Sequence, residues 1–303
     1  MFGLAYFKWE DVWSPVFLAV MLLITAGYLV LTGPIHDRMG TGKPVTVGRK
    51  VLFVLGMAVL YAAQGGPVEL LGHMMFSFHM VSMALSYLIA PPLLMLGLPD
   101  WIWSGLAGWL SGSPLSRLRF LTHPIVAAVV FNGLFSLYHF PAIHDYVMLH
   151  FTVHRLYYAV LFVAAVLMWW TLVKPVPDHS EVHGLKQMGF IFLNMVLLTP
   201  ACGLIIFAPE PLYATYSDPA VWAKAMGYCV SGDPGMLLSR FGGPEFFGYL
   251  EPAIDQQVGG IIMKFIQEII FASMLAYVFY RWYKQENREG DDLSEEDVKV
   301  NLM

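Results

Sequence analysis

The chain has 303 residues, of which 57% are hydrophobic and only 13% are charged, with a formal net charge of −5. Soluble domains carry about 25% charged residues, so this composition points to a membrane protein. The acidic balance offers no basic patch for nucleic acid, and two cysteines do not make a disulfide framework. The start of the chain lacks a basic segment and a small-residue cleavage site, so we expect no cleaved signal peptide.

Apolar runs of the length that a bilayer requires recur along the chain. A hydrocarbon core of ~30 Å is spanned by about 20 helical residues. The sequence therefore predicts an all-α membrane bundle of seven transmembrane helices, over residues 14–32, 51–66, 70–96, 124–140, 153–173, 186–208 and 258–280. In the third run, Pro91 and Pro92 should kink or terminate the helix.

Basic residues gather in alternate loops, and this asymmetry predicts an orientation. The loops after the first, third, fifth and seventh runs carry Arg38, Lys43, Arg49, Lys50, Arg117, Arg119, Lys174, Lys186, Arg281, Lys284 and Arg288. Short cytoplasmic loops are enriched in Lys and Arg, so we expect the N-terminus outside and the C-terminus inside. An odd number of spans agrees with this arrangement.

Two regions stand apart from the spans. We expect residues 1–284 to form one membrane domain, in which the outer loop 209–257, rich in Gly, Pro and aromatic residues, packs over the mouth of the bundle. The acidic segment 285–303 is predicted to be a disordered cytoplasmic tail.

Histidines cluster near the predicted outer ends of three spans. Met75, His79 and Met83 share one face of a continuous helix, and imidazole and thioether groups suit copper. Methionines also fill gaps between helices, so the functional interpretation is strongest for His79, because ionisable groups deep in a span usually serve a function. His73 opens the same run.

The fourth and fifth runs add further candidates. His139 ends the fourth run, and His150 and His154 are spaced i, i+4, which places two rings on one helix face where they can chelate a metal. Asn132 is interpreted as a helix–helix hydrogen bonder, and His144, in the turn between the runs, as a solvated loop residue.

The last run begins with Asp255, which could cap the helix, ligate a metal or orient a ligating imidazole. Deeper in this run, Lys264 and Glu268 are expected to pair and to face the bundle interior, either for ion movement or for structure. The remaining candidates are assigned to no site: His36, His123, His179, His183 and the buried Cys202.

Several of these motifs resemble those of the CtaG family. They are the segment His73–His79 followed by Pro91-Pro92-Leu93-Leu94-Met95-Leu96-Gly97, then His123-Pro124, Tyr138-His139-Phe140-Pro141, His150 and His154 with Trp169-Trp170, and Asp255-Gln256-Gln257-Val258-Gly259-Gly260-Ile261-Ile262-Met263. The resemblance covers about residues 15–283 in the expected order. Two positions depart from the commoner family pattern: His123, where an acidic residue is frequent, and Lys264, where an aromatic residue often follows the methionine.

The CtaG family is implicated in assembling caa-type cytochrome c oxidases in bacteria. The resemblance implies a multi-pass plasma-membrane assembly factor, with oxidase subunits as partners (subunit I first) and a role in maturing the copper centre. Enzyme motifs are lacking, so we expect no catalytic activity. We predict a copper site formed by His73, His79, His139, His150, His154 and Asp255.

Three alternatives to copper delivery stay open at this point. A haem protein for electron transfer would use two of the histidines as axial ligands. A transporter would use Asp255, Lys264 and Glu268. A metal-free scaffold would steady oxidase subunits without any of these groups.

Overall fold

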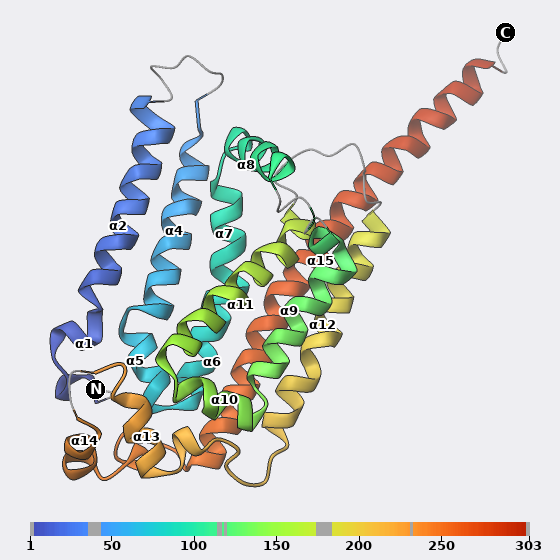
Figure 1. Cartoon of the computed structure of the whole chain (residues 1–303). Coiled ribbons are helices and arrows are strands. Elements are labelled where there is room, and N and C mark those ends of the chain that lie inside the picture. Colours follow the sequence, from blue (N-terminus) through green and yellow to red (C-terminus); the bar gives the residue numbers. More distant parts are fainter. Residues whose placement is uncertain are drawn as a thin grey trace.

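The computed structural model describes residues 3–35, 44–113, 117, 120–173, 184–230 and 233–300, and within these ranges all regular structure is helical (Figure 1). Several predicted inner-loop residues lie outside the described residues: His36, Arg38, Lys43, Arg119, Lys174, His179 and His183. The helices follow in chain order: η1 Leu4–Tyr6, α1 Trp9–Trp13, α2 Pro15–Val30, η2 Leu31–Ile35, α4 Val47–Gln64, α5 Pro67–Met74, α6 Phe76–Ala84, η3 Leu85–Ile89, α7 Ala90–Gly97, α8 Asp100–Gly112, α9 Pro124–Tyr138, α10 Pro141–Met148, α11 Phe151–Val173, α12 Gly184–Ile206, η5 Ala214–Tyr216, α13 Pro219–Met226, α14 Pro234–Phe241, η6 Pro244–Phe246 and α15 Pro252–Val300.

The predicted membrane bundle is confirmed, with one crossing bent. Among the described residues, six helical stretches are long and apolar enough to span a bilayer: Trp9–Ile35, Val47–Met74, Phe76–Gly97, Phe151–Val173, Gly184–Ile206 and Pro252–Asn287. The pair α9–α10, bent by 78°, makes a seventh crossing when it is counted as one span. The N-terminal helix η1 and the C-terminal end of α15 lie at opposite ends of the bundle (Figure 1). Which end faces the cytoplasm stays a prediction.

The sequence predicts one helix over residues 70–96. The structure instead has a break at Met75, which joins two helical arms, α5 and α6. Met75 has extended backbone angles (φ −137°, ψ 132°), so α5 ends there and α6 begins. The two arms pack closely because Gly72 has no side chain, and a Cβ at this position would lie 3.1 Å from the His79 Cα. The absence of a side chain at Gly72 therefore permits the close packing of the two arms at the break.

Further along the same span, the helix neither ends at Pro91 and Pro92 nor stays regular. The five residues Leu85–Ile89 form a π-helical turn, and the prolines occupy the first turn of α7, where a missing N–H is tolerated. The Tyr87 carbonyl in this turn accepts a hydrogen bond from Trp169 Nε1 at 3.0 Å. The irregular turn is thus tied to α11.

Close helix contacts and buried amides hold the bundle together. Asn132 on α9 donates to Asn194 Oδ1 on α12 at 2.9 Å, which confirms the helix–helix role predicted for Asn132. On the other side, the Tyr28 hydroxyl donates to the Gly97 carbonyl at 2.7 Å, which joins α2 to the end of α7. A Cβ on Gly97 would lie 2.5 Å from Phe53 N, so α4 and α7 meet backbone to backbone there.

A second apolar cluster closes one end of the bundle, which we call the capped end. There Trp222 and Phe241, from α13 and α14, pack with Leu70 and Met74 of α5 and with Val12 of α1. The segment 209–257 therefore packs against the helices instead of forming an isolated loop (Figure 1).

At the other end of the chain, α15 continues to Val300, so the structure has helix over most of the segment 285–303, where the sequence predicts disorder. The division into a membrane domain and a separate tail stays a prediction.

Candidate functional site

Five buried histidines lie together near the capped end, and we call them the histidine cluster. Their members are His73, His79, His139, His144 and His154, each no more than 7% exposed. They come from α5, α6, the end of α9, α10 and α11 respectively. Polar side chains are rarely buried in such numbers without a partner or a function.

Two local features of the chain, the break at Met75 and the bend at Pro141, position these rings near one another. The break at Met75 puts His73 and His79 on separate arms that pack against each other. Beyond His139, Pro141 starts α10 at 78° to α9, so the chain turns back across the bundle. His144 then shares its inward face with Val147 and Met148, at i+3 and i+4, and all three are buried.

The rings approach one another closely. The ring centres of His79 and His144 are 5.3 Å apart, those of His79 and His139 6.0 Å, and those of His73 and His154 5.7 Å. His79 thus adjoins both His139 and His144, and His73 and His154 form a second close pair within the same unit.

Several ring nitrogens in this unit lack a hydrogen-bond partner among the described residues. The His139 Nδ1 lies 2.8 Å from the Phe135 carbonyl, which can only accept, so Nδ1 carries the proton and Nε2 keeps its lone pair. The buried ring nitrogens without a partner are His73 Nδ1, His79 Nε2, His139 Nε2, both nitrogens of His144, and His154 Nε2.

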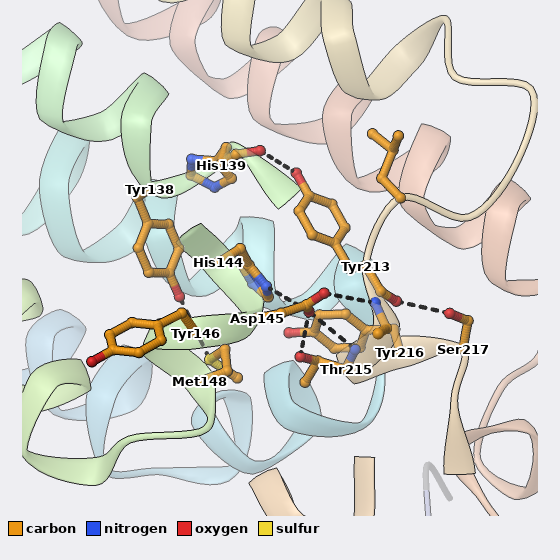
Figure 2. A network of polar contacts seen from close by, with 12 residues as sticks. Tyr138, His139, His144, Asp145, Tyr146, Met148, Tyr213, Thr215, Tyr216 and Ser217 are labelled. Atoms are coloured by element: carbon orange, nitrogen blue, oxygen red, sulfur yellow. Dashed lines mark hydrogen bonds and ion pairs between the residues drawn. The ribbon is translucent and has the colours of Figure 1, made fainter. Parts of the chain in front are cut away.

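Tyrosines enclose the cluster and fix its backbone (Figure 2). Tyr138 stacks on His79 with ring centres 5.7 Å apart, and Tyr213 lies 4.5 Å from His144. The Tyr213 hydroxyl donates to the His139 carbonyl at 2.8 Å, and the Tyr216 hydroxyl is bonded in the same way to the backbone of α5. These contacts join the η5 segment to three helices of the bundle.

Asp145, next to His144, clamps this segment in place (Figure 2). Its carboxylate accepts hydrogen bonds from Ala214 N at 3.0 Å, Thr215 N at 3.1 Å and Thr215 Oγ1 at 2.6 Å. The His144 Nδ1 lies 3.6 Å from Asp145 Oδ1, just beyond hydrogen-bond range. The Asp145 side chain, which anchors residues 214 and 215 to α10, therefore also lies beside the histidine cluster.

Two of the histidine predictions need correction. His144 is fully buried within the cluster, so its interpretation as a solvated loop residue is wrong. His150 is exposed and its ring lies beside Tyr146, with ring centres 4.2 Å apart, although His154 N donates to the His150 carbonyl as in a helical turn. Its Nδ1 instead donates to the Tyr146 carbonyl at 2.7 Å.

In the last span, Asp255, Lys264 and Glu268 form hydrogen bonds or ion pairs with other residues of the protein. Asp255 Oδ2 accepts from Ser77 N at 3.2 Å, so it caps the first turn of α6, a neighbouring helix. Lys264 and Glu268 pair as predicted, with 2.6 Å between Nζ and Oε1, but their side chains are 26% and 39% exposed. The prediction that this pair faces the bundle interior is wrong.

Sequence reasoning missed Asp145, Tyr213 and Tyr216 because their contacts span about 70 residues or more. For His144 a signal existed, since the apolar Val147 and Met148 follow it at helical spacing after a proline. In such a short element this pattern could have indicated a buried face.

Chemically, the cluster offers paired imidazole donors in a buried site. Within the described ranges, no three His, Cys, Asp or Glu side chains are arranged as a ready-made metal site. The donor chemistry still fits an ion that accepts two nitrogen ligands. An ion about 2.0 Å from each of two imidazole nitrogens places the ring centres roughly 5–6 Å apart, which matches the three ring pairs.

Comparison with known proteins gives one clear relationship. The sequence model of the cytochrome c oxidase caa3 assembly factor family (Caa3_CtaG) matches residues 26–285, which is most of the chain. No curated protein and no solved structure matches significantly. The match covers all members of the histidine cluster.

Proposed function

This chain belongs to the cytochrome c oxidase caa3 assembly factor family, and from that membership and the histidine cluster we propose that it supplies copper during assembly of the oxidase. The family and the apolar helices agree with a multi-pass bacterial membrane protein. The copper is cargo in this proposal, and the oxidase subunits are its recipients, with subunit I the first candidate.

One observation carries the copper step: several buried imidazole nitrogens have no hydrogen-bond partner in the part of the chain that the structure describes. Each unsatisfied buried polar group costs about 1–3 kcal/mol, so a cluster of them is expensive to keep unless it binds something. A soft cation would use these lone pairs and relieve the cost. Imidazole is a good ligand for copper.

His79, His139 and His144 are the best-placed ligands. His79 is near both other rings, and His139 presents a lone pair because its other nitrogen is bonded to the backbone. Imidazoles bind Cu(I) less tightly than a cage of cysteine thiolates would. Such a shell suits transfer to another protein better than storage.

The packing around the rings favours copper over haem. A haem held between two histidines needs room for a flat macrocycle roughly 10 Å across. Here Tyr138 and Tyr213 pack directly against the His79 and His144 rings, where such a macrocycle would lie. A metal ion requires only that the rings turn.

The test is metal content of the full chain, purified in detergent and loaded with Cu(I). The variant His79→Gln/His139→Gln/His144→Gln removes the proposed ligands, and His150→Gln is the matched control because that ring is exposed. We expect about one copper per wild-type and control chain, and a loss of affinity of at least ten-fold in the triple variant.

Thermal unfolding and oxidase assembly complete the experiment. The triple variant must stay folded, and cells that produce it should make caa3 oxidase with less copper. Copper bound equally by wild type and the triple variant would overturn the proposal. Normal oxidase in these cells, with no copper bound to the wild type, would favour the metal-free scaffold.

A further inference from the structure

The Lys264–Glu268 pair lies within the membrane-spanning part of the protein but is partly exposed on its surface. Lys264 and Glu268 belong to the span Pro252–Asn287 of α15, roughly 18 and 24 Å along the helix from Pro252. Lys264 borders α12, with which α15 packs, because it donates to Thr199 of that helix (Figure 1 shows the two helices). Their exposed neighbours Phe265 and Ile269 are 65% and 64% accessible, as expected of lipid-facing positions.

Charged groups at this depth are costly where lipid surrounds them. Ionisable side chains inside spans almost always face the bundle interior or a water-filled cavity. Mutual pairing reduces the cost, but the desolvation of two ions is not fully recovered in a medium of low dielectric constant. A pair exposed at the rim of a bundle is therefore better accounted for if a second protein covers it.

The hydrogen bonds of the pair show what is missing. The ammonium of Lys264 has three donors, and these reach Glu268 Oε1 at 2.6 Å, Thr199 Oγ1 at 2.9 Å and Gln267 Oε1 at 3.5 Å. The carboxylate of Glu268 can accept about four hydrogen bonds, yet Lys264 is its one recorded partner among the described residues. The pair thus has spare acceptor capacity and no spare donor.

We propose that this face of α15 is the docking site for a membrane helix of an oxidase subunit, which donates an O–H or N–H group to Glu268. The proposal rests on the assembly function proposed above. A second copy of this chain could not supply this donor from its own Lys264, whose three donors are already used. The exposed Ala272 and Ala276, one and two turns further on, leave room for close helix approach.

Photo-crosslinking in cells that assemble the oxidase tests the proposal directly. A photoreactive amino acid replaces Ala272 in the full chain, and the control position is Val129 on α9, which is 53% exposed and far along the sequence in another span. We expect an adduct with one oxidase subunit from position 272 and none from position 129.

The contribution of the ion pair is measured in the same assay. Lys264→Met/Glu268→Met removes both charges at similar volume, and such replacements usually leave folding intact. We expect the adduct yield to fall at least ten-fold in the double variant, and less in Glu268→Gln, which still accepts a hydrogen bond. Copper content should stay at the wild-type level in both.

The outcomes separate this proposal from the copper proposal. Adducts only with lipid or with a second copy, or an unchanged yield in the double variant, would overturn the docking site while the copper result stands. Loss of copper without loss of the adduct, in the histidine variants, would show that the two features act separately. A double variant that melts far below wild type is replaced by Glu268→Met, which removes only the acceptor and whose unchanged yield likewise refutes the role of Glu268.

Discussion

Replacing Asp145 with alanine should weaken the attachment of the η5 segment to the helix bundle. Asp145 Oδ1 accepts from Thr215 N and Thr215 Oγ1, and Oδ2 accepts from Ala214 N, so one side chain joins α10 to the η5 segment. Asp145→Ala removes all three bonds and leaves two backbone N–H groups without this partner.

The magnitude follows from these contacts. A hydrogen bond to a charged group contributes about 1.5–3 kcal/mol. The three bonds share one carboxylate that is 21% exposed, and water will replace part of what is lost. We therefore expect a decrease of about 2–4 kcal/mol in the free energy of unfolding, less than the sum of the separate bonds.

Asp218→Ala is the matched control. Asp218 also accepts two backbone hydrogen bonds in the same segment, from Ala220 N and Val221 N, but these only cap its own helix α13. Loss of an N-cap costs about 1 kcal/mol. Asp145→Asn should fall between the two, because one amide oxygen can keep the Thr215 contacts.

The assay combines denaturant unfolding in detergent with limited proteolysis of residues 209–230. Asp145→Ala should unfold at lower denaturant concentration and be cleaved faster in this segment than Asp218→Ala. Copper affinity should fall as well, since His144 adjoins the clamp. Equal stability and equal cleavage in the two alanine variants would show that the Asp145 carboxylate does not hold the η5 segment against α10.

Two further predictions concern other parts of the molecule. Gly97→Ala should destabilise the protein by about 2–3 kcal/mol in the same unfolding assay, because its Cβ would meet the Phe53 backbone at 2.5 Å, whereas Gly133→Ala, with open space around it, should be neutral or stabilising. Equal effects would contradict the close contact. In a Cys202→Ala background, alkylation of Cys229 should keep rising well above pH 9, because burial raises the pKa of this thiol and the thiolate is the reactive form. A rate that is half-maximal at about pH 8.5, as for a free cysteine, would contradict it.

The membrane-spanning runs could be predicted, with α9–α10 as a bent seventh, because the bilayer imposes a similar length and composition on every span. The candidate site was only partly accessible to the same reasoning. His73, His79, His139 and His154 are indeed brought together, because each lies near the same end of a predicted span. The interpretation of His144 as a solvated loop residue was wrong, because the sequence did not show that a short helix starts at Pro141 and buries this ring.

The remaining differences have separate physical origins. His150 is exposed just before α11 and bonds to the Tyr146 carbonyl, and the break at Met75 accompanies close packing of Gly72 against a residue seven positions later. Lys264 and Glu268 were assigned to the interior by the general rule for charges in membranes. That rule describes a complete assembly, and a single chain can violate it where another protein is expected.

The π-helical turn Leu85–Ile89 has a consequence for how the third crossing can evolve. Each π hydrogen bond encloses one residue more than an α hydrogen bond, and one residue corresponds to about 100° of rotation in an α-helix. The turn therefore resets the angular phase between α6, which carries His79, and α7, which meets α4 at Gly97. Deleting one residue from this turn would rotate α6 relative to α7, so that either His79 or Gly97 would no longer face its present neighbours. The orientation of His79 and that of Gly97 can therefore change separately within one crossing.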